Sequence, residues 1–253
     1  MNASAHMMRE GNRTLTELES KAFLAPAGIP VVESRLARSR EEAVRCAEEI
    51  GLPVVLKIAS PEIVHKSDCG GVRLGLRSAA EVAEAYDQIV LAAGRFHPEA
   101  RIQGVSVQRM APPGQETIIG MSKDPQFGPL LMFGIGGVMV EIMGDVSFRI
   151  APLTPKDARE MIREIKGYPL LTGFRGREPV DTEFLERLLL DVSSLVESHP
   201  EIKELDLNPV IAYRSGAVVA DSRIVLEEVS NGPKEPHGRL ESGNGCSGDR
   251  RMT

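Results

Sequence analysis

Residues 57–71 contain the residue types that bind phosphate groups, and they read KIASPEIVHKSDCGG. Lys57 lies in an apolar run, where its ammonium group must either reach solvent or meet an anion. At the other end, Gly70 and Gly71 leave backbone N–H groups open to a phosphate, and Lys66 adds a positive charge. A plain turn between two strands explains the same glycines. The segment predicts a phosphate site, with an ordinary strand and turn as the alternative.

A second set of side chains, near the end of the chain, offers oxygen atoms to a divalent metal ion. Asp206 and Asn208 alternate on a predicted strand, so their side chains project from the same face. Asp221 follows on the partner strand of a predicted hairpin. Mg²⁺ bound together with ATP phosphates takes hard oxygen ligands of this kind. Asn208 followed by Pro209 is also how a strand ends, but taken with the first segment this set predicts a nucleoside triphosphate and its metal.

Four further residues suit roles around such a nucleotide. His65 lies in the phosphate loop, and a neutral imidazole can accept a phosphoryl group and pass it on, although most loop histidines have no such role. Gln108 and Met110 end a strand, where exposed backbone groups can bond the edge of an adenine. Glu116, on the next strand, either holds ribose hydroxyls or is a surface carboxylate. The common nucleotide motifs GxxxxGKS/T and GxGxxG are both absent.

Helix starts and strand patterns predict an α+β protein that can position these residues. Helix N-caps are predicted by side-chain type and spacing at Thr16, Ser39, Ser78, Thr154 and Asp181. Extended stretches are predicted at residues 29–33, 53–58, 72–76, 105–108, 116–121, 130–133, 138–141, 148–151, 202–212 and 217–225. The rhythm of the later stretches is typical of an antiparallel sheet.

The chain is expected to divide into two lobes and two tails. Ala-Pro-Pro-Gly at 111–114 is a natural hinge, because proline fixes the backbone and glycine frees it. We therefore predict lobes at 14–110 and 111–228. Residues 1–13 show no periodic hydrophobic pattern, which predicts a flexible tail. Residues 229–253, rich in Gly, Pro, Ser and charge, cannot bury enough surface to offset their ordering entropy and predict a disordered tail.

Composition places the chain among globular proteins of a reducing compartment. Of its 253 residues, 42% are hydrophobic, which allows one large domain or two lobes. The net charge of −6 argues against nucleic-acid binding through general electrostatics. Cys46, Cys69 and Cys246 form no CxxC pair, so neither a disulfide framework nor a zinc cluster is indicated. No apolar run approaches the roughly 20 residues that span a bilayer, so we expect a cytoplasmic protein.

Set in order, these pieces resemble the ATP-grasp fold, with two lobes and a nucleotide cleft between them. More closely, the chain resembles the beta subunit of the ADP-forming acetate–CoA ligases, within the nucleoside-diphosphate-forming acyl-CoA synthetases. The resemblance runs from about residue 15 to residue 226. It is carried by AGIPVVES, GLPVVLKIASPEIVHKSDCGGVRLGL, DPQFGPLLMFGIGGVMVE, FRIAPL and ELDLNPV, several long motifs in the right order.

The resemblance implies how the phosphates of ATP or ADP are held. Lys57 takes the place of the lysine that binds the α- and β-phosphates. The loop containing Lys66, Gly70 and Gly71 is expected to cover the triphosphate. His65 falls where this family carries a phosphate-relay histidine on a mobile loop, so the resemblance implies a catalytic role for it.

The resemblance also implies the remaining contacts of the nucleotide and its metal. The backbones of Gln108 and Met110 are expected to bond adenine, and Glu116 the ribose. Asn208 and Asp221 are expected to hold Mg²⁺.

Three further residues lie in segments typical of the family. Asp206 stands where related enzymes often have Glu, and its shorter side chain argues against direct contact with the metal. Arg149 and Glu141 are assigned only to the neighbourhood of the phosphates or the metal.

The family's CoA-binding and ligase domains are expected on a separate partner chain, an alpha subunit, because the ATP-grasp unit fills most of this sequence. The implied overall reaction is acyl-CoA + ADP + phosphate ⇌ carboxylic acid + CoA + ATP, with a phosphohistidine on the partner. Two alternatives stay open. The chain is either the equivalent subunit of a succinate- or aryl-acid-specific ligase, or a non-catalytic ATP-sensing module.

Overall fold

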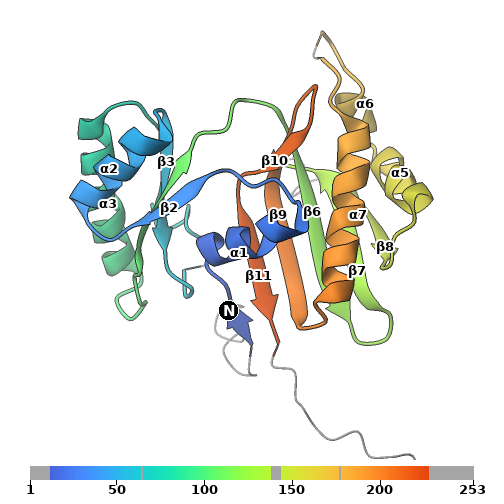
Figure 1. The fold of residues 1–253 in the computed structure, drawn as a ribbon, viewed down its shortest axis with the longest axis horizontal. Coiled ribbons are helices and arrows are strands. Elements are labelled where there is room, and N and C mark those ends of the chain that lie inside the picture. Colours follow the sequence, from blue (N-terminus) through green and yellow to red (C-terminus); the bar gives the residue numbers. More distant parts are fainter. Residues whose placement is uncertain (1–11, 64, 138–143, 177, 228–253) are drawn as a thin grey trace, which may run out of the picture.

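The computed structural model describes residues 12–63, 65–137, 144–176 and 178–227, which form two antiparallel sheets with helices packed on each (Figure 1). The elements are, in chain order, β1 (Arg13–Thr14), α1 (Glu17–Leu24), the 3₁₀ helix η2 (Ala25–Ala27), β2 (Ser34–Ala37), α2 (Arg40–Ile50), β3 (Val54–Ala59), β4 (Val72–Leu76), α3 (Ala79–Phe96), β5 (Gly104–Arg109), β6 (Gln115–Asp124), β7 (Gly128–Ile135), β8 (Val146–Ile150), α5 (Pro155–Glu164), α6 (Tyr168–Leu171), α7 (Thr182–Ser198), β9 (Ile202–Ala212), β10 (Ala217–Val219) and β11 (Ser222–Leu226). The predicted α+β class is confirmed.

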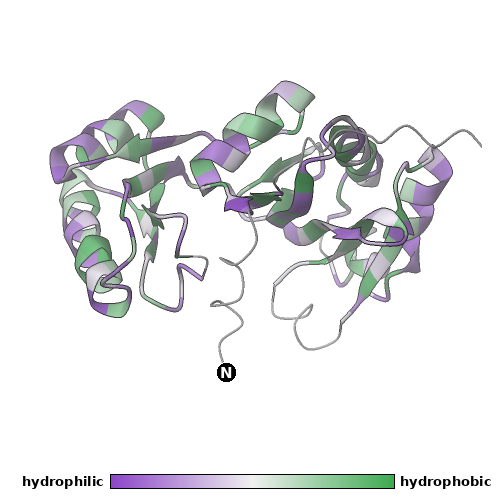
Figure 2. Ribbon diagram, turned by 90° about the horizontal axis from the view of Figure 1, so that it is seen from below, coloured by the Kyte–Doolittle hydropathy of each residue, from purple (hydrophilic) through white to green (hydrophobic). Residues whose placement is uncertain are grey.

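The helices begin where the sequence predicts. Each of the five predicted N-cap side chains accepts a hydrogen bond from the backbone N–H three residues further on; they are Thr16, Ser39, Ser78, Thr154 and Asp181. Helices of both lobes carry hydrophobic and hydrophilic segments side by side in Figure 2, as expected for helices that bury one face. In the described ranges, no helix combines the length and the apolar character that a membrane crossing needs.

The first lobe is a four-stranded sheet in the order β2-β5-β3-β4, with α2 and α3 packed on it. Side chains of β3 alternate between its faces: Leu56 and Ile58 join the core with the helices, so Lys57 projects from the opposite face. Ser106 on β5 lies directly across from Lys57 and shares that face. The first lobe therefore presents Lys57 on the face that its helices leave free.

The second lobe is a seven-stranded antiparallel sheet in the order β1-β11-β9-β6-β7-β8, with β10 paired to β9. Its core lies between the sheet and helices α5, α6 and α7, and Figure 1 shows α7 lying along the strands. Leu205 and Leu207 of β9 enter this core. Because side chains alternate along a strand, Asp206 and Asn208 project from the other face, as the sequence predicts.

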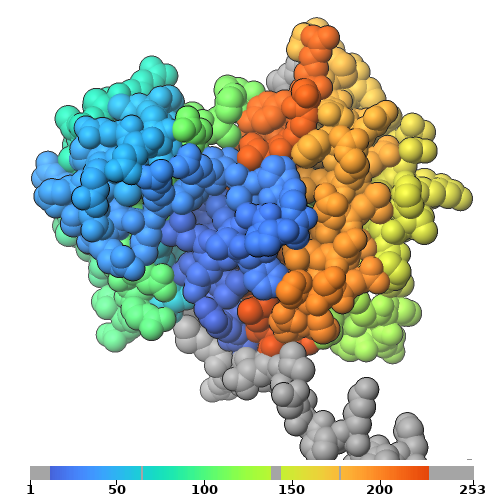
Figure 3. All heavy atoms as spheres, in the orientation of Figure 1, coloured from blue at the N-terminus to red at the C-terminus, as the bar shows by residue number. Residues whose placement is uncertain are grey.

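The N-terminal segment lies with the second lobe, although the sequence divides the lobes at residues 110 and 111. Strand β1 pairs with β11, and Leu15, Leu24 and Ile29 join the core of the larger sheet. Helix α1 consequently lies between the lobes and fills the centre of the face shown in Figure 3. Its apolar side chains belong to one lobe, which leaves polar ones free to reach the other.

The chain passes between the lobes twice. At the first passage, the N–H of Val32 donates to Val219 of the second lobe, and the carbonyl of Glu33 accepts from Arg109 of the first. The second passage is the segment 111–114, predicted as a hinge, which connects the end of β5 to the start of β6. Both passages run between the same two sheets.

Two predicted strands differ from those observed. The stretch 29–33 contains only an isolated bridge at Val31, and the strand β2 begins at Ser34 instead. The stretch 217–225 is interrupted at Ala220 and Asp221, which separate β10 from β11. Both residues contact Lys57, so the interruption is part of the site described below.

Several predictions fall outside the described residues. They concern the strand at 138–141, Glu141, and nearly all of the two tails, because residues 1–11 and 228–253 are not described. Arg13, assigned by the sequence to the N-terminal tail, lies in β1 opposite Leu226.

Candidate nucleotide and metal site

The ammonium group of Lys57 lies where the two lobes meet. Its Nζ donates to Glu17 Oε1 at 2.9 Å, to the carbonyl of Ala220 at 3.1 Å and to Asp221 Oδ2 at 3.1 Å. All three acceptors belong to α1 or to the β10–β11 break, so all three lie with the second lobe. Lys57 is buried and meets anions rather than solvent. Of the two environments that the sequence leaves open for the ammonium group, the structure shows contact with anions; its predicted binding of phosphate stays a prediction.

Glu17 connects three lysines. Its Oε1 accepts from Lys21 at 2.8 Å as well as from Lys57, and its Oε2 accepts from Lys66 at 3.2 Å. Glu17 occupies the first turn of α1, next to the N-cap Thr16, so the helix start fixes its position. We call Glu17, Lys21, Lys57, Lys66 and Asp221 the lysine cluster. Three ammonium groups and two carboxylates give it a net positive charge of one.

Lys66 reaches the cluster because the glycine turn packs against β3. Its Nζ lies 3.4 Å from Asp221 Oδ1. The N–H of Gly71 donates to the carbonyl of Lys66, and the carbonyl of Gly71 accepts from Ile58. A Cβ on Gly71 would lie 2.7 Å from the Ile58 side chain and 2.8 Å from the Lys66 carbonyl, so a larger residue would push the turn away. Gly70 has a positive φ of 69°. The pair therefore positions Lys66, while its predicted role in covering phosphates stays a prediction.

Asp221 and Asn208 lie side by side, as the predicted hairpin requires, and their role as metal ligands stays a prediction. The backbone N–H of Asn208 donates to the carbonyl of Asp221 at 3.1 Å. The side chain of Asp221 is 29% exposed, and Asn208 is exposed. Asp206 lies on the same strand face, opposite Arg223, and burial raises the pKa of its carboxyl. Oxygen-bearing side chains thus gather on β9 and on the break opposite it, although both oxygens of Asp221 already accept hydrogen bonds, from Lys57 and from the N–H of Ser222.

Burial and ion pairing oppose each other in the lysine cluster. Burial acts to raise the pKa of the Glu17 carboxyl, but Lys57, Lys21 and Lys66 outweigh it and hold the pKa below its usual range. Burial acts to lower the pKa of Lys57, but Glu17 and Asp221 outweigh it and raise the pKa. For Lys21, burial prevails over Glu17 and lowers the pKa to about 8. Near neutral pH, Glu17 and Lys57 are therefore both charged.

The residues predicted to bond adenine are engaged within the protein. Gln108 lies inside the sheet, opposite Ser34 and Val55, and its side-chain Oε1 accepts from Lys21 at 2.6 Å. The N–H of Met110 donates to the carbonyl of Pro53 at 3.1 Å. In this conformation the Met110 N–H is not available to adenine, so the predicted contact requires carbonyl groups or a shift of the hinge.

The side chains of three further predicted residues, all within the described part of the chain, form no hydrogen bond or ion pair with the lysine cluster: Glu116, His65 and Arg149. Glu116 is exposed at the start of β6, and its carbonyl accepts from Gly136 at 2.8 Å. His65 is exposed, next to Lys66 in the loop. Arg149 forms ion pairs with Glu160 and Glu164 of α5 on the helix-covered side of the sheet. The structure gives the Arg149 guanidinium local partners and does not bring it to Asp221.

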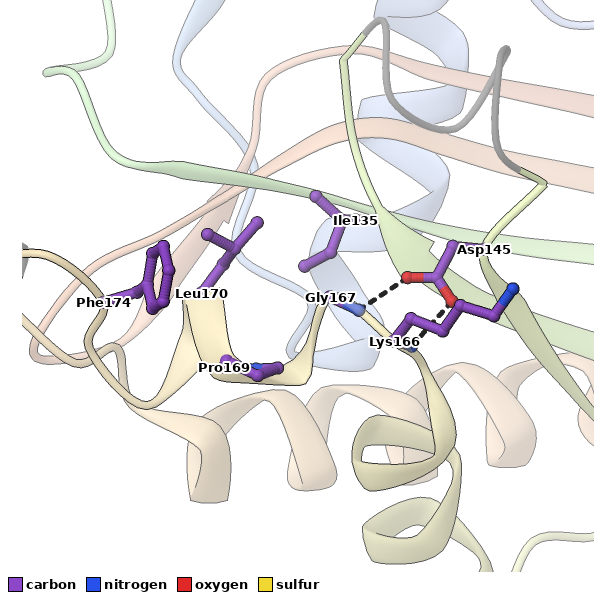
Figure 4. A pocket seen from close by; sticks show the side chains of 7 residues that line it. All are labelled: Ile135, Asp145, Lys166, Gly167, Pro169, Leu170 and Phe174. Carbon is purple, nitrogen blue, oxygen red and sulfur yellow. Dashed lines mark hydrogen bonds between the residues drawn. The ribbon is translucent and has the colours of Figure 1, made fainter.

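Free volume and charge lie in different places. A cavity of about 10 Å³ adjoins the lysine cluster and is lined by residues including Glu17, Lys66 and Ser106. A hollow of about 270 Å³ lies elsewhere, against β7 and α6 (Figure 4). Its lining is mainly apolar, and its one carboxylate, Asp145, accepts from the backbone N–H groups of Lys166 and Gly167, both at 2.7 Å. Lys166 also lines the hollow, so the lining residues offer a phosphate one ammonium group, whereas the lysine cluster has three.

Comparison with known proteins decides the family. The ATP-grasp domain family matches residues 6–226. The chain belongs to the ATP-grasp family. Among ATP-grasp proteins it is 51% identical to the beta subunit of ADP-forming acetate–CoA ligase I from Pyrococcus furiosus, over 85% of this chain and 93% of that one. It is a beta subunit of this ligase type.

Other relatives carry the same ATP-grasp unit within longer chains. ADP-forming acetate–CoA ligase I of Archaeoglobus fulgidus is 48% identical over 88% of this chain, which covers 32% of that protein. The ADP-forming 4-hydroxybutyrate–CoA ligase of Nitrosopumilus maritimus is 45% identical over 86% of this chain, again 32% of the relative. The unit thus occurs both as a subunit and as part of a longer protein.

Solved structures of one ATP-grasp relative share the fold. The acetyl-coenzyme A synthetase 1 of Ca. Korarchaeum cryptofilum, in complex with coenzyme A and Ca-AMPCP, is 55% identical with a TM-score of 0.83, over 85% of this chain and 94% of that one. A second structure of that enzyme, with coenzyme A and Mg-AMPPCP, has its phosphohistidine segment pointing towards the nucleotide binding site; it is 52% identical with a TM-score of 0.75, over 85% of this chain and 93% of that one.

Glu17 and Lys21 lie outside the sequence motifs that predict the site. Both are buried and charged, and they pair at i,i+4 spacing on α1. That spacing is visible in the sequence, but it is also common on solvated helix surfaces. Only the position of α1 between the lobes gives the pair its contacts with Lys57 and Gln108.

Proposed function

We propose that this beta subunit binds ATP or ADP with Mg²⁺ between its lobes and transfers a phosphoryl group between a phosphohistidine and ADP. The observation that carries the proposal is the meeting of Lys57 and Lys66 from the first lobe with Asp221 from the second. Lysine ammonium groups suit phosphate oxygens, and a carboxylate suits the metal that accompanies them. Each group therefore has a natural partner in a metal–nucleotide complex.

Nucleotide binding then exchanges partners within the lysine cluster. Lys57 and Lys66 turn from Asp221 to phosphate oxygens, and Asp221 turns to the metal. The cavity of about 10 Å³ beside the cluster holds about one water molecule, so the lobes or side chains must separate to admit a triphosphate. The Ser106 hydroxyl beside this cavity has no hydrogen-bond partner among the described residues, which supports a polar ligand there.

Asn208 and Asp221 fit a magnesium ion that arrives with the nucleotide. In the described part of the chain, no group of three His, Cys, Asp or Glu side chains forms a metal cage. Mg²⁺ in nucleotide sites commonly takes only one or two protein ligands and completes its shell with phosphate oxygens and water. When bound, the metal neutralises phosphate charge during transfer. Asn208 and Asp221 are the residues that would hold it.

His65 is proposed to relay the phosphoryl group. Its exposed position beside Lys66 supports access from outside the cleft and proximity to the phosphate-binding charges. The imidazole nitrogen attacks the phosphorus of the incoming phosphohistidine, and the new P–N bond forms as the old one breaks. An oxygen of the ADP β-phosphate then attacks the same phosphorus and frees His65.

The donor phosphohistidine is proposed to lie on a separate CoA-binding alpha subunit. The Pyrococcus relative, which this chain nearly covers, bears the name of a beta subunit, whereas the Archaeoglobus relative is about three times longer. Relatives named for acetate and for 4-hydroxybutyrate resemble this chain almost equally. This supports an acyl site on the partner, so the carboxylic acid is chosen there.

Cys46 and Cys69 support a reducing compartment, for which we propose the cytoplasm. Both are buried free thiols, and burial raises the pKa of the Cys46 thiol, which keeps it protonated and unreactive.

Labelled ATP tests this function against an ATP-sensing module. The beta subunit is incubated with γ-labelled ATP, Mg²⁺ and the alpha subunit, and protein-bound label is measured after acid and base treatment. Transfer predicts acid-labile label on the alpha subunit, and its loss in His65→Ala supports the relay. Tight ATP binding without any transfer to the partner supports the sensor and contradicts our proposal. A panel of carboxylic acids then identifies the substrate of the reconstituted pair.

A further inference from the structure

We propose that Glu17 is a positioning residue for nucleotide binding, which holds Lys57 and Lys66 in place when Asp221 leaves them for the metal. The inference rests on the proposed function and adds a residue to it. Glu17 touches no substrate in this role. It acts through the two lysines.

Burial, hydrogen bonds and the start of helix α1 fix the position of the Glu17 side chain. Its side chain is 3% exposed, against 29% for Asp221. Both of its oxygens accept from ammonium groups at 2.8 to 3.2 Å, and it follows the N-cap of α1, where Thr16 and Glu19 form a reciprocal capping box. Helix α1 is in turn fixed to the second lobe by Leu24 in the core. The Glu17 carboxylate therefore has the more rigid support.

On ligand binding, the two carboxylates of the lysine cluster are expected to behave differently: Asp221 changes partners, and Glu17 keeps its contacts with the lysines. Asp221 contacts Lys57 and Lys66 at 3.1 and 3.4 Å and is the more exposed of the two. When it binds a metal ion, Glu17 is the remaining carboxylate partner of both lysines among the described residues. A lysine side chain has several rotatable bonds and loses conformational entropy when it is held in one position. A fixed carboxylate orders them before the phosphate arrives.

Charge and positioning predict opposite effects when Glu17 is neutralised. Glu17→Gln raises the net charge of the lysine cluster from one positive charge to two. If the cluster acts only as a positive region, ATP then binds more tightly. If Glu17 positions the lysines, ATP binds less tightly despite the added positive charge. The sign of the change therefore separates the two roles.

Equilibrium titration of the full chain with Mg·ATP measures that sign. We expect Glu17→Gln to weaken binding on the order of tenfold, the scale of one charge-assisted hydrogen bond. Glu17→Asp keeps the charge but withdraws the carboxylate by one methylene, and it should also weaken binding. Glu19→Gln is the matched control: it lies on the same helix turn and bonds Thr16 and Arg13, but no lysine of the cluster. Its affinity should equal that of the wild type.

A double-mutant cycle shows whether Glu17 acts through Lys57. Glu17→Gln in the Lys57→Ala background should change the ATP affinity far less than it does alone, because coupled residues are not additive. Unchanged or tighter ATP binding in folded Glu17→Gln, or full additivity with Lys57→Ala, overturns the inference. If Glu17→Gln fails to fold, Glu17→Asp and the double variant, which lacks the unpaired Lys57, decide. Absence of ATP binding in the wild type instead contradicts the proposed function itself.

Discussion

The lysine cluster and the hollow beside α6 are opposite kinds of space. The cluster contains five charged groups and a cavity of about 10 Å³, whereas the hollow has about 270 Å³, a mainly apolar lining and two charged lining residues, Asp145 and Lys166. A site for a polyanion and a cation contains groups of both signs. In the lysine cluster such groups pair with one another and leave little free space. On the proposed function, the volume of a cavity is therefore a poor guide to the nucleotide site of this protein.

The largest effect is expected from Lys57→Ala. The substitution removes the ammonium group that lies between the lobes, and we expect it to weaken Mg·ATP binding by about 2–3 kcal/mol through loss of a charge-assisted contact. Isothermal titration calorimetry on the folded variant measures the loss. Nucleotide affinity equal to that of the wild type would show that the cluster is a structural ion-pair network and not a phosphate site.

Asp221→Asn should reveal the exchange of partners through its metal dependence. In excess Mg²⁺, we expect ATP binding to weaken on the order of tenfold, because the metal loses a charged ligand. With EDTA present, binding should stay unchanged or tighten, because Lys57 and Lys66 lose a competing carboxylate. Glu204→Gln is a suitable control, since Glu204 lies on neighbouring β9 and pairs with Arg223. An equal loss with and without metal would contradict the exchange.

The smallest effect is expected in the hollow. Phe174 lines it and is 46% exposed, so Phe174→Ala enlarges the hollow without touching the lysine cluster. We expect the ATP affinity to stay within about twofold of the wild type, the range of substitutions remote from a ligand. The same titration provides the measurement. A loss of ATP affinity as large as that of Lys57→Ala would indicate that the nucleotide binds in the hollow and not at the lysine cluster.

Local sequence signals predicted much of the fold. Side-chain N-caps such as Ser39 and Asp181 marked helix starts, because their hydrogen bonds form within three residues. Strand alternation correctly gave Asp206 and Asn208 the same face. Asp221 was found as their neighbour because a hairpin is also a local structure. These predictions needed no knowledge of how the lobes meet.

The parts that were missed depend on how the lobes meet. Nothing within α1 indicates that its apolar side chains, such as Leu24, enter the core of a sheet that is formed mostly by residues far along the chain. The sequence at Ala220 and Asp221 reads as continuous strand, and the acceptors that this break supplies to Lys57 are visible only in the folded protein. Glu17 reads as an ordinary first-turn acid, since helix starts favour negative charge. Its three lysines converge only in the folded protein.

The two passages of the chain between the sheets have a mechanical consequence. A body attached to another at one point can swivel in any direction, but one attached at two points turns most easily about the line that joins them. The connections near Glu33 and at 111–114 therefore favour rotation of one lobe relative to the other about a single axis, the line through the two connections. Such a rotation would separate Lys57 from Asp221 when the lobes open. It would bring the two side chains back to the same relative position when the lobes close.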